Sequence, residues 1–327
     1  MTLRFKDNII VPVYNEEESI EIFIKEVEEK TKSLPLEKIF YFVNDGSTDK
    51  TLKIIKKLAE KRDDIQYISF SRNFGKEAAL LAGLEVAVGD FVTIMDVDLQ
   101  DPPEMLPEMF EKLQEGYDVV GTRRTSRTGE PPIRSFFAKL FYKIINKISK
   151  TQIVDGARDY RLMTRQVVDS ILKLQESNRF SKGLFSWVGY EIIYLEYENR
   201  ERSRGQTSWS FWSLLRYSVD GFVNFSELPL NIATFVGILC FFISIILSLF
   251  YTVKTLVWGD SVQGFPTLVI LVLMLGGLQL LASGIIGKYL AKTFIEVKKR
   301  PNYIIKESNI KSEDEPLNNQ KGKRLVM

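Results

Sequence analysis

The chain carries a group of oxygen-bearing side chains whose spacing suits a hard metal ion. Asp96 and Asp98 are two residues apart, and Gln100 and Asp101 follow closely. Carboxylate and amide oxygens are the ligands that Mg²⁺ or Mn²⁺ takes when it is shared with substrate phosphates. A lone pair of acids at this spacing is commonly a solvated turn. Its meaning therefore depends on the elements that position it.

The composition excludes several other kinds of catalytic site. The 327 residues include no histidine and one cysteine, Cys240. Histidine acid–base catalysis, Ser-His-Asp triads and His- or Cys-rich metal centres are therefore ruled out. The 44 Lys and Arg residues nearly balance the 42 Asp and Glu residues, so the net charge of +2 does not indicate a nucleic-acid partner.

Strand and helix signals alternate along the N-terminal part of the chain. Short apolar runs predict strands at 8–13, 38–43, 65–70 and 90–95, and longer segments with helical patterns separate them. This alternation predicts βαβ units, and hence an α/β fold with a parallel sheet. A further strand is expected at 118–121.

Polar loops follow three of the predicted strands, at 14–17, 44–49 and 96–101. Ligands of such sheets bind beyond the carboxyl ends of the strands, so we expect one shared site there. The glycine patterns of dinucleotide-binding and P-loop proteins are absent from the sequence, which disfavours both classes. At the end of the fourth strand, Asp96 and Asp98 become a much stronger metal-site prediction.

The C-terminal part contains two long runs without a charged residue, 228–253 and 261–287. At ~1.5 Å per residue, either run can cross a hydrocarbon core of ~30 Å. We expect a transmembrane hairpin within 228–290, with helices at about 230–253 and 264–287. The alternative is two buried helices of a soluble core. Lysines and an arginine cluster after the second run, which predicts that both outer ends are cytoplasmic.

This division predicts a cytoplasmic domain at 1–225 and a partly disordered cytoplasmic tail at 291–327. Residues 132–150 include five cations and no acid from Arg134 onward, with apolar side chains at helical spacing between them. A basic amphipathic helix of this kind is typical of a membrane surface, and 209–225 predicts a second interfacial segment. The alternative for the first helix is a core-facing helix with a basic solvent face.

Four motifs in chain order resemble those of glycosyltransferase family 2. They are VPVYNEE at 11–17, VNDGSTD at 43–49, RNFGK at 72–76 and DVDLQDPP at 96–103. Together with the hairpin, they are similar to the motifs of polyprenyl-phosphate glycosyltransferases, such as dolichol-phosphate mannosyltransferase and bactoprenol glucosyltransferases. The resemblance covers about residues 8–300.

The resemblance implies a GT-A fold, which is Rossmann-like with a mostly parallel sheet. It implies inverting transfer of a sugar from a nucleotide-sugar to a polyprenyl phosphate such as undecaprenyl phosphate. The implied location is the cytoplasmic face of the cell membrane, where a multi-pass protein would supply a lipid-linked sugar for cell-envelope glycans. UDP-glucose or UDP-N-acetylglucosamine is the expected donor, and a homo-oligomer, a tetramer, is the expected assembly.

The resemblance also assigns residues to roles. The implied donor contacts are Pro12, Tyr14, Glu16, Asp45, Arg72, Lys76 and Arg202. The implied ligands of Mg²⁺ or Mn²⁺ are Asp96, Asp98 and Gln100. Arg123 and Arg134 would bind the acceptor phosphate, and Asp98, Asp159 and Arg161 would lie at the reaction centre. The sequence departs from the family pattern at three positions, with Arg158 in place of glycine, Ala138 in place of serine and Ser208 in place of lysine.

The implied chemistry agrees with the absence of histidine. A phosphate monoester has a second pKa near ~6, so at neutral pH it is largely a dianion and has little need of a general base. Two alternatives remain. A processive polysaccharide synthase would need more spans and a Gln-x-x-Arg-Trp motif, which this sequence lacks. A non-catalytic membrane scaffold would not need Asp96, Asp98 and Gln100 intact.

Overall fold

The computed structural model describes residues 5–125, 154, 156–177, 179–198, 228–258 and 264–310. Within these residues, an eight-stranded sheet has the order β7-β5-β6-β4-β1-β2-β3-β8. Its strands are β1 (Phe5–Val13), β2 (Leu36–Asn44), β3 (Ile65–Phe70), β4 (Phe91–Ile94), β5 (Val119–Arg124), β6 (Ala157–Thr164), β7 (Ile192–Tyr197) and β8 (Ile305–Ser308). The four strands predicted in the N-terminal part are all present, and β3 has the predicted ends.

The centre of the sheet is parallel. Strand β1 pairs in parallel with β2 and β4, and β2 pairs in parallel with β3. Strand β6 runs antiparallel between β4 and β5, and β8 runs antiparallel along β3. The prediction of an α/β fold with a mostly parallel sheet is therefore confirmed. The carboxyl ends of β1 to β4 meet at one edge, where the polar loops lie.

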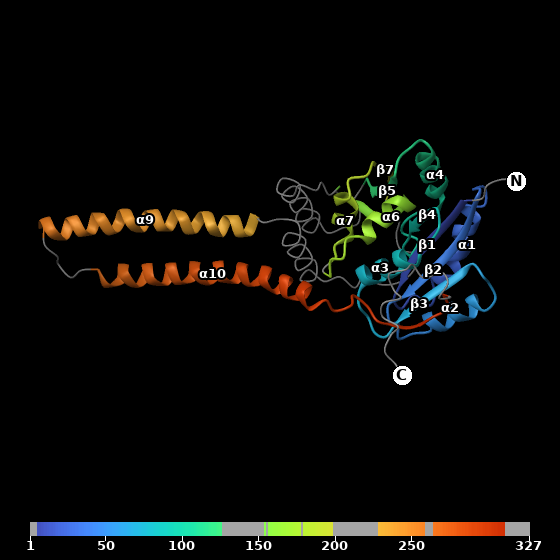
Figure 1. Cartoon of the computed structure of the whole chain (residues 1–327), viewed down its shortest axis with the longest axis horizontal. Helices are drawn as coiled ribbons and strands as arrows, with labels where there is room; N and C mark the ends of the chain where they lie inside the picture. The colour runs from blue at the N-terminus through green and yellow to red at the C-terminus, as the bar shows by residue number, and fades with distance from the viewer. Residues whose placement is uncertain are drawn as a thin grey trace.

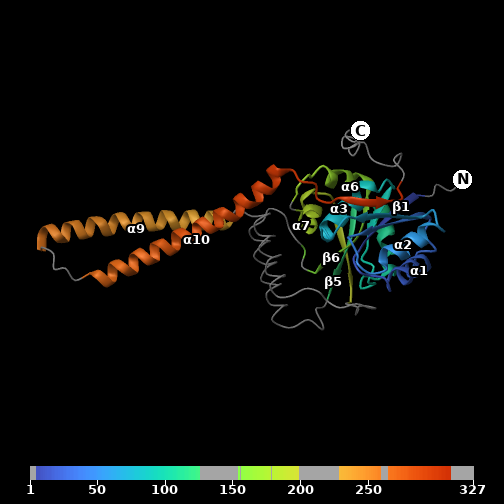
Figure 2. The same cartoon turned by 90° about the horizontal axis from the view of Figure 1, so that it is seen from below.

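Helices cover both faces of the sheet (Figures 1 and 2). One face carries α1 (Ile20–Lys30), α2 (Thr51–Ala59), the 3₁₀ turn η1 (Pro103–Met105) and α4 (Leu106–Gln114), and the other carries α3 (Lys76–Val86), α6 (Arg165–Leu172) and α7 (Ser181–Trp187). Alternation along β1 explains the two cores, because Ile9 and Val11 face the first set while Ile10 faces the second. Gly83 lets α3 approach the sheet, since a Cβ there would lie 2.3 Å from Ile10 Cγ2.

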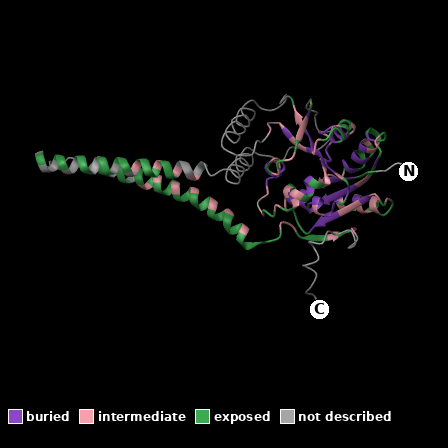
Figure 3. Ribbon diagram, turned by 45° about the horizontal axis from the view of Figure 1, so that its top comes forward, coloured by how far each residue is buried: buried purple, intermediate pink, exposed green. Residues whose placement is uncertain are grey.

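Two long helices, α9 (Leu228–Trp258) and α10 (Phe265–Lys298), run side by side away from the sheet (Figures 1 and 2). Their apolar side chains are largely exposed (Figure 3), as Leu249 at 69% and Leu280 at 77% illustrate. Among the described residues, one segment, Met274–Lys298, is long and apolar enough to cross a membrane. The predicted two-helix membrane hairpin is not confirmed, and this segment starts further along the chain than the predicted span at 264–287.

The segment that follows α10 differs from the predicted tail at 291–327. Helix α10 ends at Lys298, and the next residue, Lys299, caps it with a left-handed φ of 47°. Residues 305–308 then pair with β3 as the edge strand β8, and Tyr303 and Ile310 pack on the core beside α3. An exposed edge strand needs few apolar residues, which explains why the polar sequence suggested disorder. Residues 311–327 and the predicted interface helices at 132–150 and 209–225 lie outside the described residues.

Candidate active site

Side chains join the loops that follow β1 and β2. Asn15 has a φ of 56°, a left-handed conformation that asparagine tolerates better than most residues. Its backbone N–H donates to Ser47 Oγ at 3.0 Å, and its side-chain Oδ1 accepts the Thr48 N–H at 2.9 Å. The Glu16 N–H donates to Thr51 Oγ1 at 2.8 Å. The first two loops of the predicted site are therefore held as one unit.

Asp45 joins the second loop to the turn that follows β3. Its buried carboxylate accepts the N–H groups of Phe74 at 2.6 Å and Gly75 at 2.9 Å. Burial raises the pKa of Asp45, while the two N–H groups and the charge of Arg72 act in the opposite direction. Gly46 allows the close approach of the loops, because its φ is +69° and a Cβ would lie 2.4 Å from the Arg72 carbonyl carbon.

The other donor candidates lie around this junction. Tyr14 is 46% exposed at the end of β1, whereas Pro12 is part of β1 and pairs with Val43. The Arg72 guanidinium lies 3.9 Å from the centroid of the Phe74 ring. Tyr14 and Arg72 thus stand at the rim of the site with side-chain surface available to a ligand.

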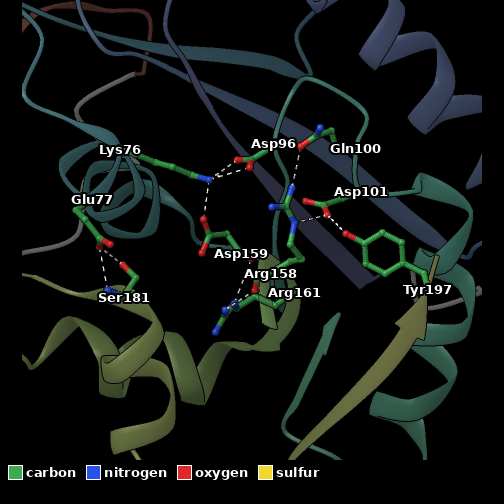
Figure 4. A network of polar contacts seen from close by, with 10 residues as sticks. All are labelled: Lys76, Glu77, Asp96, Gln100, Asp101, Arg158, Asp159, Arg161, Ser181 and Tyr197. Atoms are coloured by element: carbon green, nitrogen blue, oxygen red, sulfur yellow. Dashed lines mark hydrogen bonds and ion pairs between the residues drawn. The ribbon is translucent and has the colours of Figure 1, made fainter. Parts of the chain in front are cut away.

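Lys76 connects two acids that are far apart in the sequence. Its ammonium Nζ lies 2.7 Å from Asp96 Oδ1 and 2.6 Å from Asp159 Oδ2 (Figure 4). Because β6 runs antiparallel to β4, it carries Asp159 into the site where β4 ends. Partial desolvation disfavours the charged form of Lys76, whose side chain is 41% exposed, but the carboxylates of Asp159 and Asp96 outweigh it and raise the pKa of the ammonium. Burial would raise the pKa of Asp159, but Lys76 outweighs it and holds that pKa well below its usual range.

The loop after β4 contains a strained residue. Leu99 has a φ of 57°, which is unfavourable by about 1–2 kcal/mol for a residue with a Cβ. It lies between Asp98, which is buried, and Gln100, whose N–H donates to Asp98 Oδ1 at 3.1 Å. Backbone outliers of this kind cluster at functional sites, where the surrounding structure holds them in place. The strain therefore supports a functional role for this loop.

Arg158 and Tyr197 hold the same loop from the side, and the sequence reasoning gave neither a role. Arg158 donates to Asp101 Oδ1 at 3.0 Å and to Gln100 Oε1 at 3.3 Å, and Tyr197 donates to the same Asp101 oxygen at 2.5 Å (Figure 4). Asp101 is completely buried. Position 158 stood out only as a departure from the family pattern. Tyr197 left no signal, because β7 is remote in sequence from this loop.

Comparison with known sequences places this arrangement in a family. The profile of glycosyl transferase family 2 matches residues 8–172, just over half of the chain. The chain belongs to glycosyltransferase family 2. The sheet with its strand-end acids is accordingly the GT-A-like fold of a glycosyltransferase.

Three relatives resemble this glycosyltransferase along nearly their whole length. CsbB of Bacillus subtilis, provisionally named a glycosyltransferase, is 45% identical over 96% of this chain and 95% of its own. The SfII prophage-derived bactoprenol glucosyl transferase of Shigella flexneri is 43% identical, over 93% of this chain and 98% of its own. The prophage bactoprenol glucosyl transferase homolog of Escherichia coli K12 is 42% identical, over 92% of this chain and 98% of its own.

Solved structures resemble the catalytic part of this glycosyltransferase more distantly. Glucosyl-3-phosphoglycerate synthase from Mycobacterium tuberculosis, in complex with Mn²⁺, UDP-glucose and phosphoglyceric acid, is 20% identical. The TM-score is 0.44, and the match covers 68% of this chain and 78% of that chain. A similarity of this size adds nothing about the substrates or metals of this chain.

Arg161 supports the backbone of the glycosyltransferase site. It is 3% exposed, and its guanidinium donates to the backbone oxygens of Asp159 at 3.2 Å and Arg158 at 2.8 Å. Its Cζ atom also lies 3.7 Å from the centroid of the Phe185 ring on α7, and burial lowers the pKa of Arg161. The side chain thus holds the β6 backbone that carries Asp159. A direct catalytic role for Arg161 stays a prediction.

The acceptor candidates are less fully described. Arg123 near the end of β5 is half-buried and donates to Glu196 Oε1 at 2.9 Å, on the neighbouring strand β7. Its register partner on β6 is Ala157, two residues before Asp159. Arg123 therefore lies along the same sheet edge as the Lys76 cluster. Arg134 and the donor candidate Arg202 lie outside the described residues.

Asp96 and Asp98 have the donor atoms that Mg²⁺ or Mn²⁺ would use. In the described parts of the chain, no group of three or more His, Cys, Asp or Glu side chains could hold a metal ion. Mg²⁺, however, commonly takes one or two protein carboxylates and completes its shell with waters and substrate phosphates, so two acids fit. The Lys76 ammonium already places a positive charge against Asp96. Gln100 Oε1, the third predicted ligand, accepts a hydrogen bond from Arg158.

Proposed function

We propose that this glycosyltransferase moves a sugar from a nucleotide-sugar to a polyprenyl phosphate at the cytoplasmic face of a membrane. The observation that carries the proposal is the similarity to the bactoprenol glucosyl transferase of Shigella flexneri, which is 43% identical and is covered over 98% of its length. That similarity includes the long apolar helices as well as the catalytic domain. UDP-glucose or UDP-N-acetylglucosamine is the donor we favour, and nucleic acid is not a partner.

The interlocked loops supply the donor site on this proposal. Tyr14 and Arg72 line its rim, and Asp45 holds the turn that leads into α3. Lys76, beside Asp96, is placed to bind an oxygen of the donor diphosphate. Arg202 would add a further contact to the donor diphosphate. A Mg²⁺ or Mn²⁺ ion held by Asp96 and Asp98 would neutralise charge that develops on the leaving nucleoside diphosphate.

The reaction then needs no general base. A phosphate oxygen of the acceptor forms the new bond to the sugar C1 as the bond from C1 to the diphosphate oxygen breaks, which inverts that carbon. The acceptor is already a dianion, so no proton is removed from it. Asp159 is suited to a different task, because its low pKa keeps it ionised and its carboxylate fixes the Lys76 ammonium. We therefore assign Asp159 to positioning.

The membrane arrangement is part of the proposal. Helices α9 and α10 would form the transmembrane hairpin, with both outer ends in the cytoplasm and interface helices at 132–150 and 209–225 against the bilayer. Exposed apolar side chains along both helices support a lipid environment (Figure 3). Arg123 and Arg134 would meet the lipid phosphate, with Arg134 opening the basic interface helix. A tetramer remains the assembly we expect.

A transfer assay tests this function directly. Full-length protein in lipid vesicles is incubated with labelled UDP- and GDP-sugars, undecaprenyl phosphate and Mg²⁺ or Mn²⁺, and the lipid is then extracted. We expect label in a lipid that carries one sugar on one phosphate, from one donor far more than from the others. Label in a polymer would favour the processive synthase. Absence of transfer from every donor, in protein that binds none of the nucleotides, would favour the scaffold.

A further inference from the structure

We propose that Tyr303, on the segment that follows α10, positions the nucleotide pocket of this transferase. The C-terminal segment is defined here as residues 299–310. The proposal rests on the function proposed above, because it takes the loops at 44–49 and 71–75 as part of the donor site. None of the motifs that predicted the donor site lies in this segment.

The C-terminal segment is fixed along the edge of the sheet by backbone and side-chain contacts. The Ser71 N–H donates to the Ile304 oxygen at 2.9 Å, directly beyond the end of β3. Asn309 binds two backbone groups of β3, since its Oδ1 accepts the Tyr67 N–H at 2.6 Å and its Nδ2 donates to the Ile65 oxygen at 3.1 Å. The segment is therefore an integral edge of the sheet, and Tyr303 has a defined position.

Aromatic contacts lead from Tyr303 to the donor loops. The Tyr303 ring stacks on Phe70, the last residue of β3, with 4.9 Å between centroids and 15° between planes. Phe70 packs edge-to-face on Phe74, with 5.8 Å between centroids. The Phe74 N–H in turn donates to Asp45 at 2.6 Å. Tyr303 thus lies behind the turn whose backbone Asp45 holds.

Tyr303 also reaches the helix on the far side of that turn. Its hydroxyl group donates to Glu85 on α3, the helix that begins with Lys76. Tyr303 therefore contacts the strand that enters the turn at 71–75 and the helix that leaves it. Because both flanks are held, the turn keeps a fixed position relative to Asp45. Small displacements of positioning groups can cost a binding or catalytic site much of its efficiency.

The other end of the segment is held near the long helix. Glu296, in the last turn of α10, accepts the Ser177 N–H with both carboxylate oxygens, at 2.9 and 3.1 Å. Glu296 and Tyr303 are only seven residues apart in the sequence. Both are fixed to the catalytic domain, Glu296 through Ser177 and Tyr303 through Phe70. The end of α10 and the donor pocket are therefore tied through one short connection.

Titration calorimetry with UDP and GDP, each with Mn²⁺, on the full-length protein in detergent tests the proposal. We expect Tyr303→Ala to raise the Kd of the nucleotide that wild type binds by roughly five- to tenfold, because the aromatic stack is lost. Tyr303→Phe keeps the stacked ring but loses the hydrogen bond to Glu85, so it should give a smaller rise in Kd, about two- to threefold. Glu307→Gln is the matched control, since Glu307 lies on the same segment as Tyr303 but pairs with Lys56 on α2.

The readouts separate positioning from a general loss of fold. A role in stability alone would lower the number of binding sites per molecule and leave Kd unchanged, which would overturn the proposal. An equal rise in Kd for Glu307→Gln would also overturn it. If Tyr303→Ala does not yield folded protein, Tyr303→Leu replaces it with the same expected rise. If wild type binds neither nucleotide, the proposed function itself fails, whereas normal binding by both Tyr303 variants removes only this inference.

Discussion

Lys76 on α3 and Asp159 on β6 form an ion pair with 2.6 Å between Nζ and Oδ2, although 83 residues separate them. The same ammonium binds Asp96 at the end of β4. One cation thus joins the helix, the central strand and the antiparallel strand at the edge of the sheet where the proposed donor loops lie. Two carboxylates in this position need a positive charge between them.

The first prediction concerns this cation. Lys76→Met should lower sugar transfer roughly tenfold or more, because the proposed charge-assisted contact to the donor diphosphate is lost. The same variant should bind Mn²⁺ more tightly in the absence of donor, since the ammonium no longer competes for Asp96. Calorimetry with MnCl₂ and initial rates measure the two effects. Lys112→Met removes the cationic partner of the exposed Glu115 and serves as the control. Unchanged Mn²⁺ affinity in Lys76→Met would contradict this role.

The second prediction concerns Asp98, a proposed metal ligand. Asp98→Asn keeps the side-chain oxygen that accepts the Gln100 N–H, so the strained loop should stay folded. We expect transfer to fall by about 100-fold, which is typical for loss of an electrostatic group at a transition state. EDTA should abolish wild-type activity, and Mg²⁺ or Mn²⁺ should restore it. Rates equal to wild type for this variant, or full activity in EDTA, would show that the loop is not a metal site.

The third prediction concerns the support of that loop. Arg158→Ala leaves the buried Asp101 carboxylate without its cationic partner and should lower the free energy of unfolding by about 3 kcal/mol. Tyr197→Phe removes one hydrogen bond to the same oxygen and should cost about 1 kcal/mol. Urea unfolding of the full chain in detergent measures both. The double variant Arg158→Ala with Asp101→Asn should be less destabilised than the sum of the single variants, and strict additivity would contradict the pairing.

The fourth prediction concerns pH. Asp7 on β1 is fully buried, and burial raises its pKa to about 6 despite a hydrogen bond from Thr93 and the charge of Lys38. The folded protein therefore binds this proton more tightly than the unfolded chain. The stabilisation of the fold by protonated Asp7 is complete below about pH 4 and is lost as the pH rises through about 6. Asp7→Asn should raise the free energy of unfolding at pH 7 by about 2 kcal/mol.

Urea unfolding of wild type and Asp7→Asn at several pH values between 4 and 7.5 checks this prediction. The difference between the two proteins should grow across this range. Asp169→Asn is a suitable control, because Asp169 is exposed and pairs with Arg165 on the surface of α6. A constant difference between wild type and Asp7→Asn would show that Asp7 titrates normally in the folded state.

The sequence predicted the elements whose pattern is local. Apolar runs defined β1 to β4, and the polar loops at their ends marked the edge where Asp45 and Asp96 lie. Strand β6 was not predicted as a strand, because its sequence ARDYRLMT places charged residues in a strand interior. Arg161 is accommodated there by backbone oxygens and the Phe185 ring, neither of which is visible in the sequence around it.

Contacts between remote segments were beyond the reach of sequence patterns. Tyr197 binds Asp101 from a strand 96 residues away, and Tyr303 reaches Phe70 from beyond both long helices. Lys76 and Asp159 were each singled out by family resemblance, but their pairing follows only from the antiparallel placement of β6 beside β4. The residue types were therefore predictable, whereas the partners required the fold.

Strand β8 also constrains the order in which the protein is made. A ribosome synthesises the chain from its N-terminus, so β3 emerges long before residues 305–308. The free edge of β3 must wait, unpaired, until α9 and α10 have both left the ribosome. Unpaired strand edges invite aggregation during folding. Completion of the catalytic sheet must therefore follow synthesis of both long helices, and a chain cut after Lys298 would be released with that edge still open.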